Sequence, residues 1–510
     1  MSGNGELPDG WTTAQLSDVS TILMGQSPPS STYNIECDGL PFFQGKAEFG
    51  SLYPEPKVWC SQPGKIAEAN DILLSVRAPV GPTNLAPGKC CIGRGLAAVR
   101  PETGLDLKYL LHAFRCSASV LDARGTGTTF KAVSGKVVRE FALPIAPSEE
   151  QSRIADALDE LFSDLDAGVA ALERVRGKLK LYRASVLKAA VEGTLTAEWR
   201  AQHPHTEHAS ELLQRILTER RRRWEEEQLR KFKEKGQEPP TNWKAKYKQP
   251  VIPDTTNLPP LPSGWCWVSW AQVGFSQNGR PFPSSDYEDA GTKLLRPGNL
   301  YADGAIRWTD RNSRYMPDRY AEESPDLIVG AGELIINLTA QSLKDDFLGR
   351  VCITGEGEHC LLNQRLARLN TVIIPARFML WMFKSAWFRV FVAGLNTGSL
   401  IQHMFTSQLE HFVFPLPSLA EQEVIVEAVE DQLSIIDHLE ADLDAKLESA
   451  QALRQAILRH AFTGQLVPQN PNDEPASELL KRIAEEREAR ARVAAAAKEE
   501  PMRVARRKKS

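Results

Sequence analysis

Two long helical patterns dominate the arrangement of apolar and polar residues along the chain. In the first, apolar residues recur at steps of three and four from Leu158 to Val186, and only Gly168 interrupts them. Sustained steps of this kind are typical of a helix that pairs with another helix along one narrow seam. The residues for which we predict helix pairing are Leu158, Leu161, Leu165, Leu172 and Leu179.

The same seam returns in the second half of the chain, with polar interruptions at Gln432 and Lys446. Proline-serine pairs at 147–148 and 417–418 favour helix starts, and Gly193 and Gly464 favour helix stops. Each helix of about 43 residues spans roughly 65 Å. The predicted pairing residues of the second helix are Val429, Ile436, Leu439, Leu443 and Leu453.

The regions before the two helices have a different pattern, in which short apolar runs alternate with glycine and proline turns. We name these regions head one (residues 1–147) and head two (residues 251–416). Residues 71–76 and 333–338 predict strands, whereas residues 107–114 and 378–391 predict helices. We therefore expect two α+β heads in which strands outnumber helices.

The two halves repeat one another. Leu7-Pro8-Asp9-Gly10-Trp11 returns as Leu261-Pro262-Ser263-Gly264-Trp265, and the helix-start and helix-stop motifs return in the same order. Internal repeats of this length predict a duplicated fold. The predicted regions are head one (1–147), a spacer helix (148–195), a charged helix and proline-rich extended linker (196–250), head two (251–416), a second spacer helix (417–466), and a C-terminal helix with a basic tail (467–510).

The spacing between the copies favours pairing of the two spacer helices. From Trp11 to Trp265 is 254 residues, but from Gly193 to Gly464 is 271, so the heads vary in length while the helices do not. Each head precedes its helix, so antiparallel pairing places the heads at opposite ends with approximate two-fold symmetry. Two separate helices, each packed on its own domain, are the alternative.

Composition narrows the class of protein. Of 510 residues, 42% are apolar and 25% are charged, as in ordinary globular proteins. The 61 Lys and Arg residues against 65 Asp and Glu residues leave a net charge of −4, which excludes a polybasic nucleic-acid binder. We find no run of 18 apolar residues, no signal-peptide pattern and no C-x-x-C pair among the eight cysteines. We therefore expect a soluble, reduced, cytoplasmic protein with no membrane partner.

Motifs of catalysis are missing from the sequence. No G-x-x-x-x-G-K-[ST] loop predicts ATP hydrolysis, and no G-x-G-x-x-G follows a strand in a βαβ context. The nearest approach to the N-P-P-[FYW] loop of an amino-methyltransferase, at residues 257–260, lies in the proline-rich linker with the wrong spacing. His203, His205 and His208 lack cysteine or carboxylate partners at ligand spacing, so we predict no metal site. We expect no catalytic residue and no cofactor on this chain.

Small and polar residues on loops are the remaining candidates for chemistry. Small residues let backbone N–H groups approach a phosphate, and neighbouring Lys, Arg, Gln or Asn reach phosphate oxygens or base edges. A glycine-rich turn with a purely structural role is the alternative. The candidate DNA-binding residues are Lys46, Ser75, Arg77, Gly125, Thr126, Gly127, Thr128, Lys131 and Lys136 in head one, and Arg296, Asn299, Asn337, Thr397, Gly398, Ser399, Gln402 and His403 in head two.

In the order of these motifs, the chain resembles the DNA-specificity subunits of type I restriction–modification systems. The resemblance rests on the duplicated Leu-Pro-x-Gly-Trp opening, the segments 71–81 and 92–95, the Thr-Gly loops, the Pro-Ser…Glu-Gln helix start, and the ending Val191 to Thr196. It covers nearly the whole length. Residues 363–365 of head two stand where head one has residues 92–95, but their side chains differ.

The resemblance implies a non-catalytic subunit of a restriction and adenine-methyltransferase complex. In that family each head is a target recognition domain that reads one half of a bipartite, asymmetric site in double-stranded DNA. The paired helices bind two methyltransferase subunits, and restriction subunits that translocate DNA complete the complex. S-adenosylmethionine, ATP and Mg are then expected on the partner subunits.

Charge adds one expectation about affinity. Residues 1–150 contain 13 Lys/Arg against 15 Asp/Glu, and residues 251–417 contain 14 against 16, so each head carries about −2. Because neutralisation of phosphates dominates non-specific affinity, we expect the isolated chain to bind DNA weakly. Two other classes stay open: a stand-alone sequence-specific DNA-binding protein, and an enzyme fragment with its own methyl-donor site.

Overall fold

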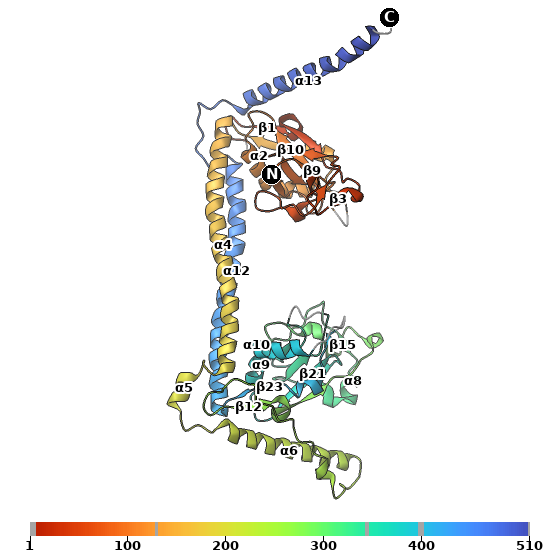
Figure 1. Ribbon diagram of the computed structural model, residues 1–510, viewed down its shortest axis with the longest axis vertical. Coiled ribbons are helices and arrows are strands. Elements are labelled where there is room, and N and C mark those ends of the chain that lie inside the picture. Colours follow the sequence, from red (N-terminus) through yellow and green to blue (C-terminus); the bar gives the residue numbers. More distant parts are fainter. Residues whose placement is uncertain (1–6, 128–130, 342–345, 396–401, 508–510) are drawn as a thin grey trace. The chain divides into compact units, whose positions relative to one another are not determined.

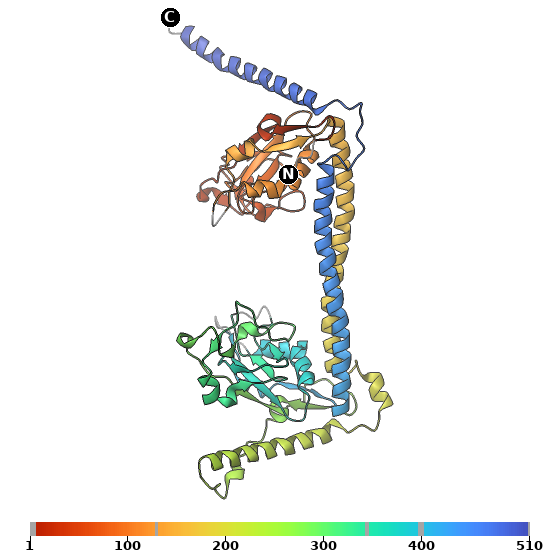
Figure 2. The same ribbon diagram turned by 180° about the vertical axis from the view of Figure 1, so that it is seen from behind.

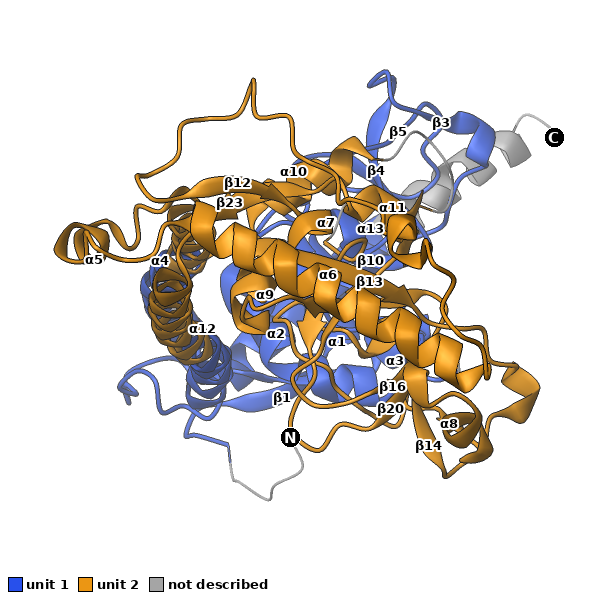
Figure 3. Cartoon of the chain, turned by 90° about the horizontal axis from the view of Figure 1, so that it is seen from below, with its two compact units in different colours: residues 1–173, 444–510 blue, residues 174–443 orange. Residues whose placement is uncertain are grey.

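The structure is a computed structural model that describes residues 7–127, 131–341, 346–395 and 402–507. It divides into two compact units (Figure 3): unit 1 contains residues 1–173 and 444–510, and unit 2 contains residues 174–443. The division falls within both long helices, α4 (Ser148–Glu192) and α12 (Leu419–Ala461). Each unit therefore combines one head with part of each helix, and mixes helix with sheet as the α+β prediction requires.

Unit 1 contains three sheets in the part that the structure describes. An antiparallel sheet has the order β2-β10-β7-β8, a mixed sheet has the order β3-β5-β4-β9-β6, and β1 pairs with β11. The strands are β1 Thr12–Gln15, β2 Ser20–Met24, β3 Tyr33–Asn34, β4 Leu40–Phe43, β5 Trp59–Cys60, β6 Ile66–Ala67, β7 Ile72–Ser75, β8 Thr83–Leu85, β9 Cys90–Ile92, β10 Leu96–Pro101 and β11 Ala142–Ile145. The shorter helices are α1 Leu16–Val19, α2 Leu107–Ala123 and α3 Gly135–Arg139.

Head two follows the same plan. Its strand order β13-β21-β17-β19 corresponds to β2-β10-β7-β8, and β12 pairs with β23 as β1 pairs with β11. Its strands are β12 Cys266–Ser269, β13 Gly274–Asn278, β14 Thr292–Leu295, β15 Tyr315–Met316, β16 Ile328–Val329, β17 Leu334–Asn337, β18 Thr339–Ala340, β19 Val351–Ile353, β20 Cys360–Leu362, β21 Leu366–Thr371, β22 Gln402–His403 and β23 Val413–Leu416. Its helices are α7 Trp270–Val273, α8 Arg319–Glu323, α9 Ala376–Lys384, α10 Ala386–Gly394 and α11 Thr406–Leu409.

The helix predicted over residues 378–391 is two helices. The side chain of Ser385 accepts a hydrogen bond from the backbone N–H of Phe388, so this serine caps the start of α10 and separates it from α9. Capping serines have extended backbone angles that interrupt a helix. The strong apolar pattern on both sides of Ser385 concealed this break.

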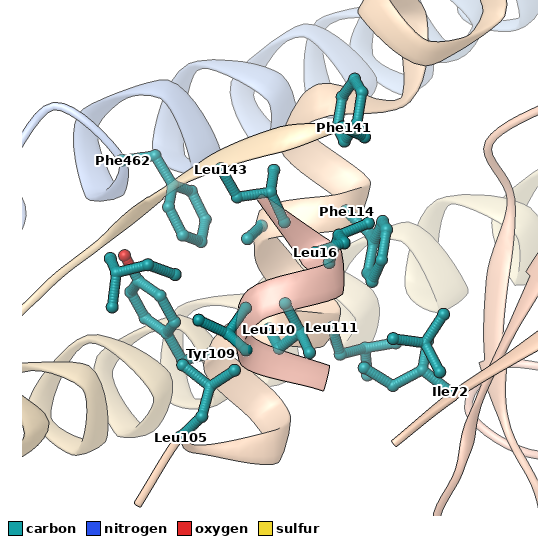
Figure 4. Packing of buried hydrophobic residues seen from close by; sticks show 14 of the residues in the cluster. Leu16, Ile72, Leu105, Tyr109, Leu110, Leu111, Phe114, Phe141, Leu143 and Phe462 are labelled. Carbon is teal, nitrogen blue, oxygen red and sulfur yellow. The ribbon is translucent and has the colours of Figure 1, made fainter. Parts of the chain in front are cut away.

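The core of unit 1 joins segments that are distant in the sequence. Figure 4 shows Leu16, Tyr109, Phe114 and Leu143 packed together with Phe462, which follows α12. The rings of Tyr109 and Phe462 have their centroids 5.1 Å apart. Burial of apolar surface at this junction stabilises the head and the helix together.

The repeated sequence motifs contact each other in both units. Trp11 donates a hydrogen bond from Nε1 to Glu150 at 3.0 Å, and Trp265 donates one to Glu421 at 2.8 Å. All four residues are at least nine-tenths buried. Because a buried carboxylate requires a donor, the tryptophan of the opening motif and the glutamate of the helix start depend on each other.

The two long helices lie side by side within each unit (Figures 1 and 2). In unit 1, Arg454 of α12 forms an ion pair with Asp166 of α4. In unit 2, Arg183 of α4 forms ion pairs with Asp437 and, at 3.1 Å, with Glu440 of α12. These contacts join α4 to α12 in each unit separately.

Burial along the predicted seam is uneven. Leu158, Val429 and Ile436 are fully buried, but Leu161, Leu439 and Leu453 are 38%, 45% and 50% exposed. In α4 the buried face runs instead through Ile154, Leu158 and Phe162. The physical reason is that this part of the helix packs on head one as well as on α12, so its apolar face follows steps of four. Of the other predicted residues, Leu179 and Leu443 are buried, and Leu165 and Leu172 are half-buried.

Each head also packs against one further helix, which comes from outside its own copy of the repeat. Helix α6 (Ala209–Glu234) packs on head two, and α13 (Ala476–Arg507) packs on head one. Ala209 donates its backbone N–H to Gly264 at 2.9 Å, and Ala476 donates its N–H to Gly10 at 2.8 Å. The helix that follows one copy is therefore bound by the head of the other copy. A short helix, α5 (Ala197–Gln202), precedes α6.

The prolines of the linker after α6 predicted an extended chain, but part of the linker is folded. Residues 243–246 form a 3-10 turn, and Trp243, only 9% exposed, stacks on Trp224 of α6 with ring centroids 5.8 Å apart. Burial of aromatic surface folds the linker back on the helix. Among the described residues, no helix is both long and apolar enough to cross a membrane.

Candidate nucleic-acid interface

Backbone hydrogen bonds connect three loops of head one into one surface. Gly93 donates its N–H to Phe43 at the end of β4, at 2.8 Å, and Val76 donates to Gly95 at 2.9 Å. Val133 in turn donates to Val76 at 2.9 Å. The loops after β4, between β9 and β10, and after β7 therefore meet, together with the segment that follows α2. The structure thus brings together loops that the sequence places up to 90 residues apart.

Close backbone approach explains the glycines of this surface. A Cβ atom added to Gly95 would lie 2.2 Å from the carbonyl oxygen of Gln44, a distance that no side chain tolerates. Gly127 has a φ of +118°, in the region that favours glycine. These glycines have a structural role whether or not a ligand binds next to them.

Several predicted residues of head one present charge at this surface. Lys46 and Arg77 are exposed, and so is Arg94, which the predicted set omits. Arg77 forms a β-bridge with Ala132, next to Lys131, and Thr126 forms a second bridge with the same alanine. Arg77, Lys131 and residues Gly125 to Gly127 of the Thr-Gly loop therefore lie together.

Two of the predicted lysines have acidic partners. Lys131 contacts Asp122 at 2.9 Å, and Lys136 of α3 lies 3.8 Å from Glu140, the residue after that helix. Exposed pairs of this kind are weak, so a phosphate group is able to compete for either lysine. Four further predicted residues, Thr128, Thr397, Gly398 and Ser399, lie outside the described residues.

Head two builds the same surface with other side chains. Asn363 donates its N–H to Leu295 at the end of β14, at 3.2 Å, and Leu338 donates to Arg365 at 2.9 Å. Met404 donates to Leu338 at 3.0 Å, next to the β18–β22 pair that contains the predicted Gln402 and His403. Position for position, Gln364 stands where head one has Arg94, and Arg365 stands where it has Gly95.

Three predicted residues hold the loops from inside. Ser75 is buried and donates from Oγ to the carbonyl groups of Arg77 and Pro79, at 3.1 and 2.9 Å. Asn337 is fully buried and donates to Thr339 and Phe347, both at 2.8 Å. Asn299, also fully buried, accepts a hydrogen bond from the backbone N–H of Arg296 at 2.9 Å. These side chains shape the surface, and a direct contact of theirs with DNA stays a prediction.

A hollow of about 710 Å³ lies at this surface in head two. Its lining includes Arg296, Arg311, Arg314 and Arg365, and within the described ranges none of the four makes an ion pair. No Asp or Glu is among the described residues that line it. The full lining is Phe282, Ser284, Tyr287, Arg296, Pro297, Gly298, Arg311, Asn312, Arg314, Phe347, Asn363, Gln364 and Arg365.

Such a hollow suits the edges and phosphates of nucleic acid. Arginine donates two parallel hydrogen bonds to guanine or phosphate, whereas Asn and Gln donate one hydrogen bond to N7 of adenine and accept one from its amino group. The residues predicted from the sequence do not include Arg311, Arg314 and Arg365. Two features of the sequence could have indicated them: the polar loop 310–314, and the arginine at position 365 where head one has Gly95. Only the fold shows that these loops share one hollow with Arg296.

Comparisons with known proteins find similar domains and subunits. The family model of the type I restriction modification DNA specificity domain matches residues 8–173. The MjaX type I restriction enzyme specificity subunit of Methanocaldococcus jannaschii is 43% identical over 163 residues, which cover 31% of this chain and 38% of that relative. The StySPI specificity subunit of Salmonella potsdam is 25% identical over 95% of this chain and 96% of its own length.

One solved structure is similar in sequence over a third of the chain. The HsdS subunit of Thermoanaerobacter tengcongensis is 48% identical over 32% of this chain and 40% of that chain, with a TM-score of 0.30. The MjaX and HsdS matches thus span less than half of those relatives, whereas the StySPI match spans nearly all of that subunit. The comparisons thus find a type I restriction modification DNA specificity domain over the first head, and similarity to type I restriction enzyme specificity subunits along almost the whole length of the chain.

Proposed function

We propose that each head reads one half of a bipartite, asymmetric site in double-stranded DNA. The observation that carries this proposal is a loop surface built twice by the same backbone hydrogen bonds but lined by different side chains. Equal scaffolds with Arg94 in one head and Gln364 in the other present different donors and acceptors. Because direct readout depends on those groups, the two heads recognise different half-sites.

The proposal includes a fixed distance between the half-sites, set by antiparallel pairing of α4 and α12. The ion pairs support it. Arg183 and Arg454 are 271 residues apart, and so are the aspartates Asp166 and Asp437 with which they pair. An arginine of each copy thus pairs with the equivalent aspartate of the other copy, which is the pattern of a two-fold symmetric interface.

The chain itself supplies recognition in this proposal, and partner subunits supply the chemistry. The long helices dock two methyltransferase subunits, and restriction subunits that translocate DNA join them. S-adenosylmethionine, ATP and Mg bind to those partners. A cytoplasmic location follows from double-stranded DNA as the ligand.

The test is a methylation map. The chain is co-expressed with the neighbouring methyltransferase gene in a host without DNA methylation, and adenine methylation is mapped across the genome. We expect modification at one split, asymmetric sequence with a fixed gap. A soluble complex that modifies no site would contradict the proposal, and a tight DNA complex without any methyltransferase partner would support a stand-alone DNA-binding protein instead.

Matched variants assign the half-sites to the heads. Arg94→Ala is expected to relax or abolish recognition in one half of the site only, and Gln364→Ala in the other half only. Loss of one base contact costs roughly 1–3 kcal/mol, enough to make a defined position degenerate in the map. Arg492→Ala, on the exposed surface of α13, is the control and leaves the motif unchanged.

A further inference from the structure

The distal half of α6 and the linker folded on it form a strongly basic segment. Residues 219–248 contain 11 Lys/Arg and 6 Asp/Glu, a net charge of +5. The whole chain carries −4, so everything outside this segment carries −9. We name residues 219–248 the basic arm.

Aromatic packing gives the basic arm a defined shape. Trp243 lies between Trp224 and Phe232 of α6, with ring centroids 5.8 and 6.4 Å away. Tyr247 packs edge-on against Trp224 at 5.3 Å, and its hydroxyl accepts a hydrogen bond from Arg220 at 3.0 Å. The linker lysines are therefore held along α6 instead of being dispersed on an extended chain.

Five of the six acidic residues of the arm form ion pairs, and the sixth, Glu238, makes none within the described part of the chain. Glu225 contacts Arg221 and Lys244 at 3.1 and 3.0 Å, and Glu227 contacts Arg230 and Lys231 at 2.7 and 3.3 Å. What remains is a set of four exposed lysines that make no ion pair within the described part of the chain. These four are Lys233, Lys235, Lys246 and Lys248.

The arm is fixed to head two through the buried start of α6 and the end of β21. Leu212 and Ile216 at the start of α6 are fully buried, and Arg223 donates to the carbonyl oxygen of Thr371, the last residue of β21, at 3.5 Å. In Figures 1 and 3 the far end of α6 points to the side of unit 2 that carries α8, and Figure 3 shows β14 on that side as well. The ring of Tyr320 on α8 packs against Phe282, which lines the hollow, with centroids 5.6 Å apart.

We infer that the basic arm binds the phosphate backbone of double-stranded DNA, outside the bases that head two reads. The inference rests on DNA binding by the heads as proposed above. Lysines without acidic partners bind phosphates as point charges and carry no sequence information. The arm thus supplies affinity that head two, at about −2, lacks.

The experiment measures salt dependence with the full chain. The variant Lys233→Gln/Lys235→Gln/Lys246→Gln/Lys248→Gln is compared with wild type for binding to a 40-base-pair duplex of arbitrary sequence, by fluorescence anisotropy from about 50 to 200 mM salt. Each lost phosphate contact lowers the slope of log affinity against log salt by about 0.9, so we expect a decrease of roughly 3–4 and at least about tenfold weaker binding at the lowest salt. The decrease is the same for every duplex sequence.

Two further variants make the result specific. Lys57→Gln/Lys89→Gln/Lys178→Gln/Lys180→Gln removes the same charge from exposed positions elsewhere and leaves the slope nearly unchanged. The four Lys→Arg changes in the arm retain the wild-type slope because the charge is kept. Equal slopes for the arm variant and wild type would overturn the inference, and so would an unchanged slope with loss of the methyltransferase subunit, which would make the arm a protein-docking surface.

The methylation map separates this inference from the proposed function. If the wild-type complex modifies a split site and the arm variant modifies the same site less completely, both stand. If wild type modifies nothing, the proposed function fails, and the salt slope still decides whether the arm binds DNA.

Discussion

His112 on α2 is a buried histidine in contact with a long helix. Its Nε2 atom lies 3.2 Å from Oδ1 of Asp159 on α4, its ring packs against Phe162, and its Nδ1 atom has no hydrogen-bond partner among the described residues. Burial, and then the positive charge of Arg115, lower the pKa of His112 from 6.5 to about 4, although Asp159 opposes the shift. The imidazole is therefore neutral at neutral pH.

This shifted pKa predicts how the stability of unit 1 depends on pH. As the pH falls below 6.5, His112 is protonated in the unfolded chain, but in the folded chain it stays neutral until about pH 4. The free energy of unfolding therefore falls by about 3 kcal/mol between these two pH values. His112→Gln is expected to remove this fall in the free energy of unfolding at low pH. Hydrogen exchange of α2 at pH 7 and pH 4.5 measures it, and exposed His205→Gln is the control. Equal pH dependence in wild type and His112→Gln would show that His112 does not contribute.

At the scale of elements, the packing of α13 on head one is the least local feature of the fold. Leu479 and Ile483 are 3% and 2% exposed, and they belong to the same core cluster as Leu16 and Val19 of α1. An element from the end of the chain therefore completes a core at its beginning. Its equivalent, α6, buries Leu212 and Ile216 at head two.

We predict that Leu479→Ala destabilises unit 1 by about 2–4 kcal/mol, because the substitution leaves a cavity in a core that cannot close around it. Protease resistance and hydrogen exchange of residues 12–24 report the loss. Glu485→Ala, at an exposed position of the same helix, is expected to change neither. If Leu479→Ala left the protection of residues 12–24 at the wild-type level, α13 would not be part of that core.

At the scale of the whole molecule, charge predicts the affinity of the isolated chain. With about −2 on each head and +5 on the basic arm, the chain alone is expected to bind duplex DNA weakly and to lose that binding steeply with salt. Anisotropy titrations of the chain with and without the methyltransferase subunit measure this. A nanomolar, salt-insensitive complex of the chain alone would contradict the prediction.

Much of the architecture followed from local patterns. Long helices and a duplication are encoded by repeated short-range spacing, so α4 begins at the predicted Ser148 and ends at Glu192, just before Gly193, whose φ of +70° suits a helix stop. The seam was less accurate, because Leu161 and Phe162 are both apolar and only the neighbouring head decides which of them is buried. The division into units inside the helices was not predictable from the pattern.

The candidate interface, too, could be predicted from the sequence only in part. The polar loops of both heads were recognised from residue type, but Ser75, Asn299 and Asn337 are turned inward, and residue type does not show which way a loop side chain points. Arg311, Arg314 and Arg365 were not among the predicted residues, because the sequence does not show that their loops share one hollow with Arg296.

The sequence by itself determined the duplication, the helices, the α+β character of the heads and the resemblance to specificity subunits, since each depends on spacing within one stretch of chain or on its repetition. Only the tertiary structure decided which loops share a surface, which head binds α6 and α13, and that the linker folds into a basic arm. These depend on contacts between residues that are far apart in the sequence, and such contacts follow from packing and buried hydrogen bonds, which local patterns do not record.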